Sequence, residues 1–193
     1  MVRAETLTSD KNPLLKEIRR AIGRGALTES GLCVAETFHL LEEALRSGCQ
    51  VPTVLAAQSV HTAVENHVAK LSGTRVLTLD DALFARLSAT ETSQGVMALV
   101  RPPAWDLGQL LRGRTLLVIL DGIQDPGNAG TMIRAAEAFG ATGVLFVKGS
   151  VNPYNPKAVR ASAGSIFRVP IVAGLDHALV RAGFRGLGLD LEE

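Results

Sequence analysis

The sequence predicts an α/β protein built from two successive units. Short apolar segments alternate along the chain with amphipathic segments of helical period, which is the pattern of strands separated by helices. Pro102 and Pro103 interrupt this pattern, because proline is excluded from helix interiors and central strands. We therefore expect a first α/β domain over residues 1–101, a linker over residues 102–113 and a second, parallel-sheet α/β domain over residues 114–193.

The first unit is expected to begin with a helix that Asn12 caps and that carries Pro13 in its first turn. The apolar residues that follow recur at helical spacing, at Leu14, Leu15, Ile18 and Ile22. Apolar runs predict strands over residues 32–35, 54–57, 75–79 and 95–100. Helices are expected over residues 37–46, about 61–71, and from Asp80 or Asp81 to residue 87.

The second unit opens with an uninterrupted apolar run at residues 115–120, which is typical of a parallel strand covered on both faces. Further strands are expected over residues 143–147, 168–172 and 187–191. Helices are expected over residues 131–139, after the Asn155-Pro156 pair, and over residues 176–182. Right-handed crossovers between parallel strands would bring the strand-to-helix loops to one edge of the sheet, where open α/β sheets bind ligands.

Composition excludes several classes of protein. The formal net charge is +1 and aromatic residues make up 4% of the chain, so neither a strongly basic nucleic-acid binder nor a base-stacking platform is indicated. Cys33 and Cys49 do not form a disulfide framework, the four histidines are scattered, and no metal site is expected. The chain has no apolar run of membrane-spanning length and no signal peptide, so a reducing, cytoplasmic location is expected.

Residues 120–140 carry the strongest functional signal. They lead from an apolar strand through a segment with Gly127, Asn128 and Gly130 into a helix that carries Arg134. This arrangement suits an anion or a ribose-phosphate at a helix N-terminus, with the two glycines adopting positive φ and letting the backbone approach the ligand. The spacing fits neither a P-loop nor a dinucleotide-binding glycine motif, and another α/β enzyme that binds a nucleotide remains an alternative.

The segment DPGNAGTMIRAAEAFG at residues 125–140 resembles the first motif of the SpoU (TrmH-like) RNA ribose methyltransferases. The resemblance continues through NPKAVRASAGSIFRVP at residues 155–170. Upstream, residues 34–45 and 93–100 resemble the RNA substrate-binding domain that precedes the catalytic domain in many members. The resemblance implies a SPOUT-type domain with a trefoil knot, usually homodimeric. It also implies methyl transfer from S-adenosylmethionine to a ribose 2′-hydroxyl of RNA, with ribosomal RNA favoured over transfer RNA.

In this resemblance Asn128 and Arg134 match the catalytic Asn and Arg of the motif, and the Arg is the residue proposed to activate the ribose hydroxyl. A guanidinium stays charged, holds phosphate bidentately and stabilises a developing alkoxide. Two structural alternatives stand beside this one: Arg134 pairs with Glu137 on the helix surface, and Asn128 caps the helix.

Six residues are candidates for contact with RNA. Lys16, Arg19 and Arg20 form a small basic patch on the first helix, and a solvated polar face is the favoured alternative. Lys157 and Arg160 are equally compatible with phosphate contacts or with solvation. Ser162 is as compatible with close helix packing, together with Gly164, as with substrate contact.

Two further motifs of the family, a Gly-x-Glu-x-x-Gly-like loop and a Ser-Leu-Asn-like loop, are absent and would follow Glu193. The second domain is therefore expected to be C-terminally incomplete, with the S-adenosylmethionine site beyond Glu193. A non-catalytic RNA-binding module of the same family is the alternative function. Thr37, where many relatives have Gly, and His39, where a basic residue is frequent, leave the RNA contacts of the first domain undefined.

Overall fold

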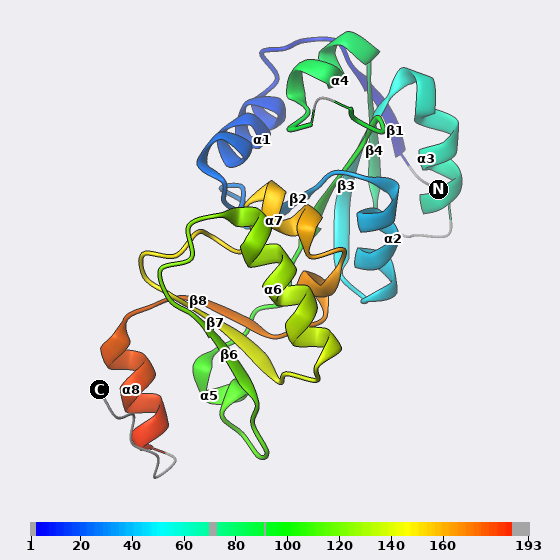
Figure 1. Ribbon diagram of the computed structural model, residues 1–193. Coiled ribbons are helices and arrows are strands. Elements are labelled where there is room, and N and C mark those ends of the chain that lie inside the picture. Colours follow the sequence, from blue (N-terminus) through cyan, green and yellow to red (C-terminus); the bar gives the residue numbers. More distant parts are fainter. Residues whose placement is uncertain (1–2, 70–72, 91, 187–193) are drawn as a thin grey trace.

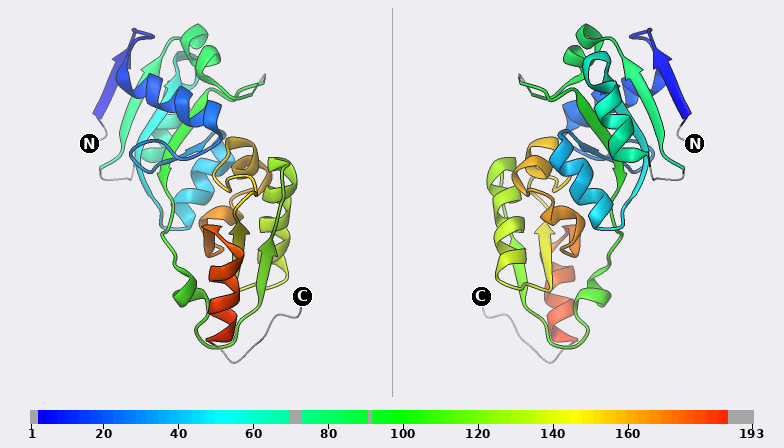
Figure 2. Two further views of the ribbon diagram at one scale, coloured as in Figure 1. Left: turned by 90° about the vertical axis from the view of Figure 1, so that its left-hand side faces the viewer. Right: turned by 90° about the vertical axis from the view of Figure 1, so that its right-hand side faces the viewer.

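The computed structural model describes residues 3–69, 73–90 and 92–186, which form two β-sheets with helices packed around them (Figure 1). Figure 2 shows the same two units from both sides, one above the other along the long direction of the molecule. The fold is mixed α/β, as the sequence predicts. Within the described residues no helix has the length and apolarity needed to cross a membrane.

The first sheet has the strand order β1-β4-β3-β5-β2. Its strands are β1 (Arg3–Leu7), β2 (Cys33–Ala35), β3 (Gln50–Ala57), β4 (Arg75–Leu79) and β5 (Val96–Arg101). β1, β4 and β3 run parallel, whereas β5 lies antiparallel to β3 and to β2. The sequence did not predict β1, because its five residues include an arginine and a glutamate and carry little apolar pattern.

Helices cover both faces of the first sheet. They are α1 (Pro13–Arg24), α2 (Phe38–Arg46), α3 (His61–Val68) and α4 (Asp81–Leu87), with a short 3-10 turn, η1 (Gln58–Val60), before α3. α1 and α4 lie on one side of the sheet, and α2 and α3 lie on the other (Figure 1). Their buried side chains belong to two separate hydrophobic clusters, one on each face. As expected, α1 begins with the Asn12 side chain accepting a hydrogen bond from Leu14 N and with Pro13 in its first turn.

The second sheet is fully parallel, with the order β6-β7-β8 within the described residues. Its strands are β6 (Leu117–Leu120), β7 (Gly143–Val147) and β8 (Ile171–Leu175). Its helices are α5 (Leu107–Leu110), α6 (Pro126–Ala138), α7 (Pro156–Ala161) and α8 (His177–Arg185), and η2 (Ser165–Phe167) is a 3-10 turn. The strand expected over residues 187–191 lies outside the described residues.

β6 corrects one expectation. Its apolar run predicted a strand covered on both faces, but Ile119 is 38% exposed and only Leu120 is fully buried. In the described part of the chain β6 pairs with β7 alone, so its other edge has no strand partner there.

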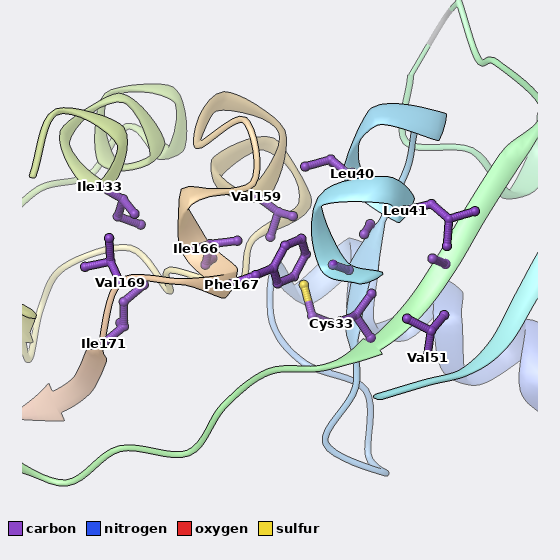
Figure 3. Packing of buried hydrophobic residues seen from close by; sticks show 14 of the residues in the cluster. Cys33, Leu40, Leu41, Val51, Ile133, Val159, Ile166, Phe167, Val169 and Ile171 are labelled. Carbon is purple, nitrogen blue, oxygen red and sulfur yellow. The ribbon is translucent and has the colours of Figure 1, made fainter. Parts of the chain in front are cut away.

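One of the two hydrophobic clusters is shared by the two units. Phe167 of η2 and Val159 of α7 are buried in the same cluster as Cys33 of β2 and Leu40 of α2 (Figure 3). Burial of a side chain as large as Phe167 stabilises the folded state by roughly 1.5–3 kcal/mol. The division at residues 102–113 stays a prediction: the chain there connects the two sheets, which share one buried cluster, while the α1 and α4 side of the first sheet has a second cluster of its own.

An ion-pair cluster lies at the same junction. The Arg168 guanidinium, which follows η2, donates to the carboxylates of Glu137 on α6 and of Glu43 on α2. Arg168 thus connects the two units electrostatically beside the shared core. Its hydrogen bond holds the pKa of Glu137 below the ordinary value. Burial acts to raise the pKa of Glu43, but the hydrogen bond and charge of Arg168 outweigh it and lower that pKa as well.

Candidate functional site

The segment predicted as a glycine-rich loop is the first turn of α6. The helix begins at Pro126 rather than at residue 131, because Asp125 caps it by accepting a hydrogen bond from Asn128 N at 2.7 Å. Pro126 then occupies the first helical position, where its missing N–H costs nothing. The expectation that Asn128 caps the helix is therefore wrong, since Asn128 lies three residues inside the cap.

Gly127 and Gly130 are helical and do not have positive φ. The reason for a glycine at position 130 is close packing between α6 and α7. A Cβ on Gly130 would lie 2.7 Å from Ala161 Cβ, 2.9 Å from Ser162 N and closer still to the Ala158 carbonyl oxygen. The glycine therefore brings two helices together, which corrects the expectation of a flexible phosphate loop.

Arg134 lies on the exposed surface of α6. Within the described part of the chain its guanidinium makes no hydrogen bond or ion pair. The alternative in which Arg134 pairs with Glu137 is wrong, because the Glu137 carboxylate is held by Arg168. Arg134 is thus a cation that no carboxylate of the described residues neutralises, on the helix that carries the motif.

Asn128 and Arg134 do not form one contact site by themselves. Six positions along an α-helix separate two residues by about 9 Å along the axis and turn their directions about 120° apart. Both residues are exposed, and Thr131 lies between them with its hydroxyl bonded to Gly127 O at 3.0 Å. A ligand that touches both residues must therefore extend along the outer face of α6.

Lys157 brings a second cation to the start of α6. Its ammonium lies 3.5 Å from the Asp125 carboxylate, and its Cε lies 3.7 Å from the position of a Cβ on Gly127. The hydrogen bond from Asn128 N is the main cause that lowers the pKa of Asp125, and the charge of Lys157 acts in the same direction. Asp125, Asn128 and Lys157 therefore form one charged, exposed group at the helix start.

The remaining candidates of α7 are less accessible than the sequence indicated. Arg160 is half-buried, and its Nη1 is a buried nitrogen that has no hydrogen-bond partner among the described residues. Ser162 is fully buried and its hydroxyl donates to Val159 O at 2.7 Å. This burial supports helix packing for Ser162 rather than contact with RNA.

The cations of α1 are largely matched by nearby acids. Arg19 pairs with Asp10, and Arg20 lies 2.7 Å from Glu29. Lys16 is exposed and its ammonium has no acidic partner among the described residues. Contact between RNA and the basic surface of α1 stays a prediction. Of the three cations there, Lys16 alone has no acidic partner among the described residues.

Sequence reasoning missed two ion pairs at the carboxyl edge of the second sheet. His177 Nε2 lies 2.8 Å from Asp121 Oδ2, and Lys148 Nζ lies 3.5 Å from Asp176 Oδ2. Asp121, Lys148 and Asp176 directly follow β6, β7 and β8, so their positions after predicted strands were the available signal. The hydrogen bond from Leu179 N, which caps α8, is the main cause of the lowered pKa of Asp176.

Glu36 in the first unit was also missed. It is 3% exposed and accepts hydrogen bonds from Ala89 N and from the hydroxyls of Ser88, Thr90 and Ser93. This buried carboxylate therefore orders the segment before β5, which includes part of the family-like stretch at residues 93–100. A glutamate directly after the buried strand β2 was the signal in the sequence.

Thr37 and His39, which follow Glu36, have structural roles. The Thr37 side chain caps α2 by accepting a hydrogen bond from Leu40 N at 3.1 Å. His39 Nε2 lies 3.3 Å from the Ala163 carbonyl oxygen, so this histidine contacts the second unit.

The carboxyl edge of the second sheet is open in the described part of the chain. The side chains of Asp121 and His177 at the carboxyl edge are 55% and 67% exposed, whereas a nucleoside is ordinarily bound in a concave, largely buried pocket. The predicted cofactor site beyond Glu193 lies outside the described residues. In the described part of the chain no group of three or more His, Cys, Asp or Glu side chains is arranged to hold a metal ion.

Comparison with known families assigns both units. Residues 115–189 match the family model described as the SpoU rRNA Methylase family, and residues 12–98 match the MRM3-like substrate binding domain. The chain belongs to the SpoU methyltransferase family. The motif around α6 lies within the first of these matches, so the resemblance stated from the sequence is confirmed.

Individual relatives of this SpoU chain include rRNA methyltransferases. The 23S rRNA (guanosine(2553)-2′-O)-methyltransferase RlmP of Bacillus subtilis is 32% identical over 166 residues, which are 86% of this chain and 64% of RlmP. The human mitochondrial rRNA methyltransferase 3 is 32% identical over 157 residues, which are 79% of this chain and 37% of that protein. The chain thus spans less than two thirds of the length of these relatives.

Solved structures confirm the fold. An rRNA methyltransferase from Sinorhizobium meliloti superposes with a TM-score of 0.79 at 28% identity, over 95% of this chain and 70% of that one. The SpoU methyltransferase AviRb from Streptomyces viridochromogenes, in complex with AdoMet, gives a TM-score of 0.80 at 26% identity, over 92% of this chain and 69% of that one.

Proposed function

We propose that the protein containing this chain transfers a methyl group from S-adenosylmethionine to a ribose 2′-hydroxyl of RNA, with ribosomal RNA as the favoured substrate. The observation that carries the proposal is the exposed Arg134 guanidinium, which lies within the SpoU match and has no carboxylate partner among the described residues. The rRNA methyltransferases among the relatives support the choice of substrate.

Arg134 suits the chemistry of ribose methylation. A ribose 2′-hydroxyl is a poor nucleophile and must lose its proton as it attacks the methyl group. A guanidinium without a carboxylate partner has its N–H donors free and its charge uncompensated, so it can bind an RNA phosphate bidentately and stabilise the developing alkoxide. Asn128, about one and two thirds turns earlier on α6, has both a donor and an acceptor for the ribose.

Lys157 and the first unit have supporting roles in this proposal. Lys157 sits beside the start of α6 and adds positive charge for the phosphate backbone. Lys16 provides a second phosphate contact on α1, with Arg19 and Arg20 beside it. Arg160 is the weaker candidate of the two on α7, because it is half-buried and its Nη1 is enclosed.

A homodimer is part of the proposal. Leu116, Met132 and Phe139 are 54%, 37% and 84% exposed, and with their neighbours they line an apolar depression of about 280 Å³ beside β6 and α6. Exposed apolar surface of this kind marks association sites in soluble proteins. This patch supports an interface that includes α6.

A non-catalytic RNA-binding module is the second candidate function. The observation in its favour is the open carboxyl edge of the second sheet, where the Asp121 and His177 side chains are more than half exposed. Calorimetric titration with S-adenosylmethionine separates the two candidates: RNA binding without any S-adenosylmethionine binding would favour the module.

The decisive experiment removes the Arg134 guanidinium. Arg134→Ala should abolish transfer of radiolabelled methyl groups from S-adenosylmethionine to ribosomal RNA, a loss of at least 100-fold, on the order expected when a preorganised charge is removed from the reacting centre. Arg86→Ala on α4 is the matched control, because it also removes one exposed helical arginine. Ordinary turnover by a folded Arg134→Ala protein would refute the role of this residue.

A further inference from the structure

A cleft of about 370 Å³ lies where the two units meet, between the chain after β5 and the outer edge of β8. The chain contains one tryptophan and one tyrosine, and both line this cleft as Trp105 and Tyr154. The Arg101 side chain lines it as well. A chain with few aromatic residues has therefore brought its two largest ring types into one cavity together with a cation.

Local structure keeps the cleft open. Pro102 and Pro103 follow β5 directly and prevent the chain from continuing as a paired central strand. Gly31 adopts φ +76°, and a Cβ there would lie 3.7 Å from Arg101 Nη1, so a side chain at this position would occupy space beside the guanidinium. On the opposite wall, β8 pairs only with β7 among the described residues, which leaves the polar backbone groups of its outer edge without a strand partner there.

The side chains of the cleft are suited to a flat, polar-edged ligand. Trp105 is 39% exposed, so much of its surface can still contact a ligand, and Tyr154 is half-buried. Tyr154 also packs against the shared hydrophobic cluster, and this burial raises its pKa to about 12, so Tyr154 contributes an uncharged aromatic wall. Arg101 has no carboxylate partner within the described ranges, so its guanidinium can stack on a ring or bind a phosphate.

We propose that this cleft binds one unpaired base of the RNA substrate. The inference rests on the proposed function, which makes RNA the ligand, and adds a place where the RNA is held. Aromatic rings stack with any base, the arginine meets the adjoining phosphate, and the open edge of β8 offers hydrogen-bonding groups to the base edge. A base within a duplex is stacked and paired, so the cleft selects single-stranded or looped RNA.

The cleft is separate from the α6 surface. The cleft is lined by β8, by the chain after β5 and by Tyr154 before α7, and neither Asn128 nor Arg134 of α6 is among its lining residues. The base in the cleft is therefore a different nucleotide from the one whose ribose meets Arg134.

Trp105 provides the test, because it is the only tryptophan and its fluorescence reports on this cleft alone. The chain is titrated with an unlabelled single-stranded RNA of about twelve nucleotides and with the same sequence as a duplex. Binding is followed independently by the anisotropy of a fluorescein-labelled copy. We expect the single strand to quench the tryptophan emission, with the same RNA concentration at half-saturation as in the anisotropy titration. The duplex should quench the emission far less.

Two variants complete the experiment. Trp105→Ala should weaken binding of the single strand about tenfold, as expected for the loss of one stacked base, and Trp105→Phe should restore most of the affinity. Arg101→Ala should weaken binding more than the control Arg86→Ala, which removes the same charge elsewhere on the surface. Circular dichroism of each variant confirms that the fold is retained.

The outcomes separate the cleft from the proposed function. RNA binding by anisotropy with unchanged tryptophan emission and unchanged affinity of Trp105→Ala would overturn the cleft and leave the proposed function standing. If anisotropy shows no RNA binding to the unaltered protein, the proposed function fails and the cleft proposal fails with it.

Discussion

Substitution of Gly130 by alanine should destabilise the protein, although alanine is the better helix former. A Cβ at this position would lie 2.7 Å from Ala161 Cβ, about 0.7 Å short of the 3.4 Å at which ordinary contacts begin, and it would also meet backbone atoms of α7. Overpacking of this kind costs about 1–3 kcal/mol, and backbone neighbours, which have no rotamers to change, favour the upper end. Alanine regains about 1 kcal/mol of helix propensity, which leaves a net loss of about 2 kcal/mol.

Thermal unfolding followed by circular dichroism measures this loss. For a chain of this size about 2 kcal/mol lowers the Tm by roughly 4–8 °C. Gly23→Ala is the matched control, because Gly23 is an exposed residue of α1 with nothing within 4 Å of its Cβ position. It should gain about 1 kcal/mol and raise the Tm by roughly 2–4 °C. A Gly130→Ala protein as stable as the unaltered chain would refute the close-packing argument.

Two further predictions concern buried or bridging charges. Arg168→Gln should make the free energy of unfolding depend less steeply on pH below about pH 4.5. Arg168 lowers the pKa values of Glu137 and Glu43, and this stabilises the folded protein above the ordinary glutamate pKa of 4.5. That stabilisation is lost as the pH falls through the folded-state pKa values, and the variant does not have it to lose. Urea unfolding at several pH values measures the free energy of unfolding of both proteins. An equally steep fall of that free energy with falling pH in both would contradict the prediction. Glu36→Gln should lower the free energy of unfolding by about 1–3 kcal/mol, because an amide oxygen cannot accept all the hydrogen bonds that the carboxylate accepts. The control Glu65→Gln on α3, where the side chain is 41% exposed, should change the free energy of unfolding little. Equal unfolding midpoints for these two variants would rule out an ordering role for Glu36.

The sequence predicted the fold class and most elements because local signals and tertiary structure agree there. Asn12 and Pro13 start α1 as expected, and the apolar run at residues 143–147 is a fully buried strand. β1 was missed because a five-residue parallel edge strand depends on its pairing with β4 more than on its own apolar pattern. The sequence prediction started α6 five residues late, because Gly127 and Gly130 indicated a loop although Asp125 and Pro126 are typical of a helix start.

The candidate site was predictable only in part. Position on a helix is a local property, so the sequence indicated that Arg134 lies on a helical surface within the motif. The partner of Glu137 was not predictable, because Arg168 reaches it across 31 residues of sequence while also binding Glu43 of the first unit. The burial of Ser162 and the meeting of Trp105 with Tyr154 likewise depend on how distant segments pack.

The shared core beneath Phe167 has a mechanical consequence. Side chains from both units interleave there and Arg168 spans the same junction, so any movement of one unit against the other would have to break this packing and these ion pairs. Under the proposed function, the distance from the first unit to the Arg134 guanidinium is then a constant of the molecule. RNA bound by the first unit would therefore bring to Arg134 only a nucleotide at one set distance from the bound segment. The residues that recognise the RNA can then lie far from the ribose that is methylated.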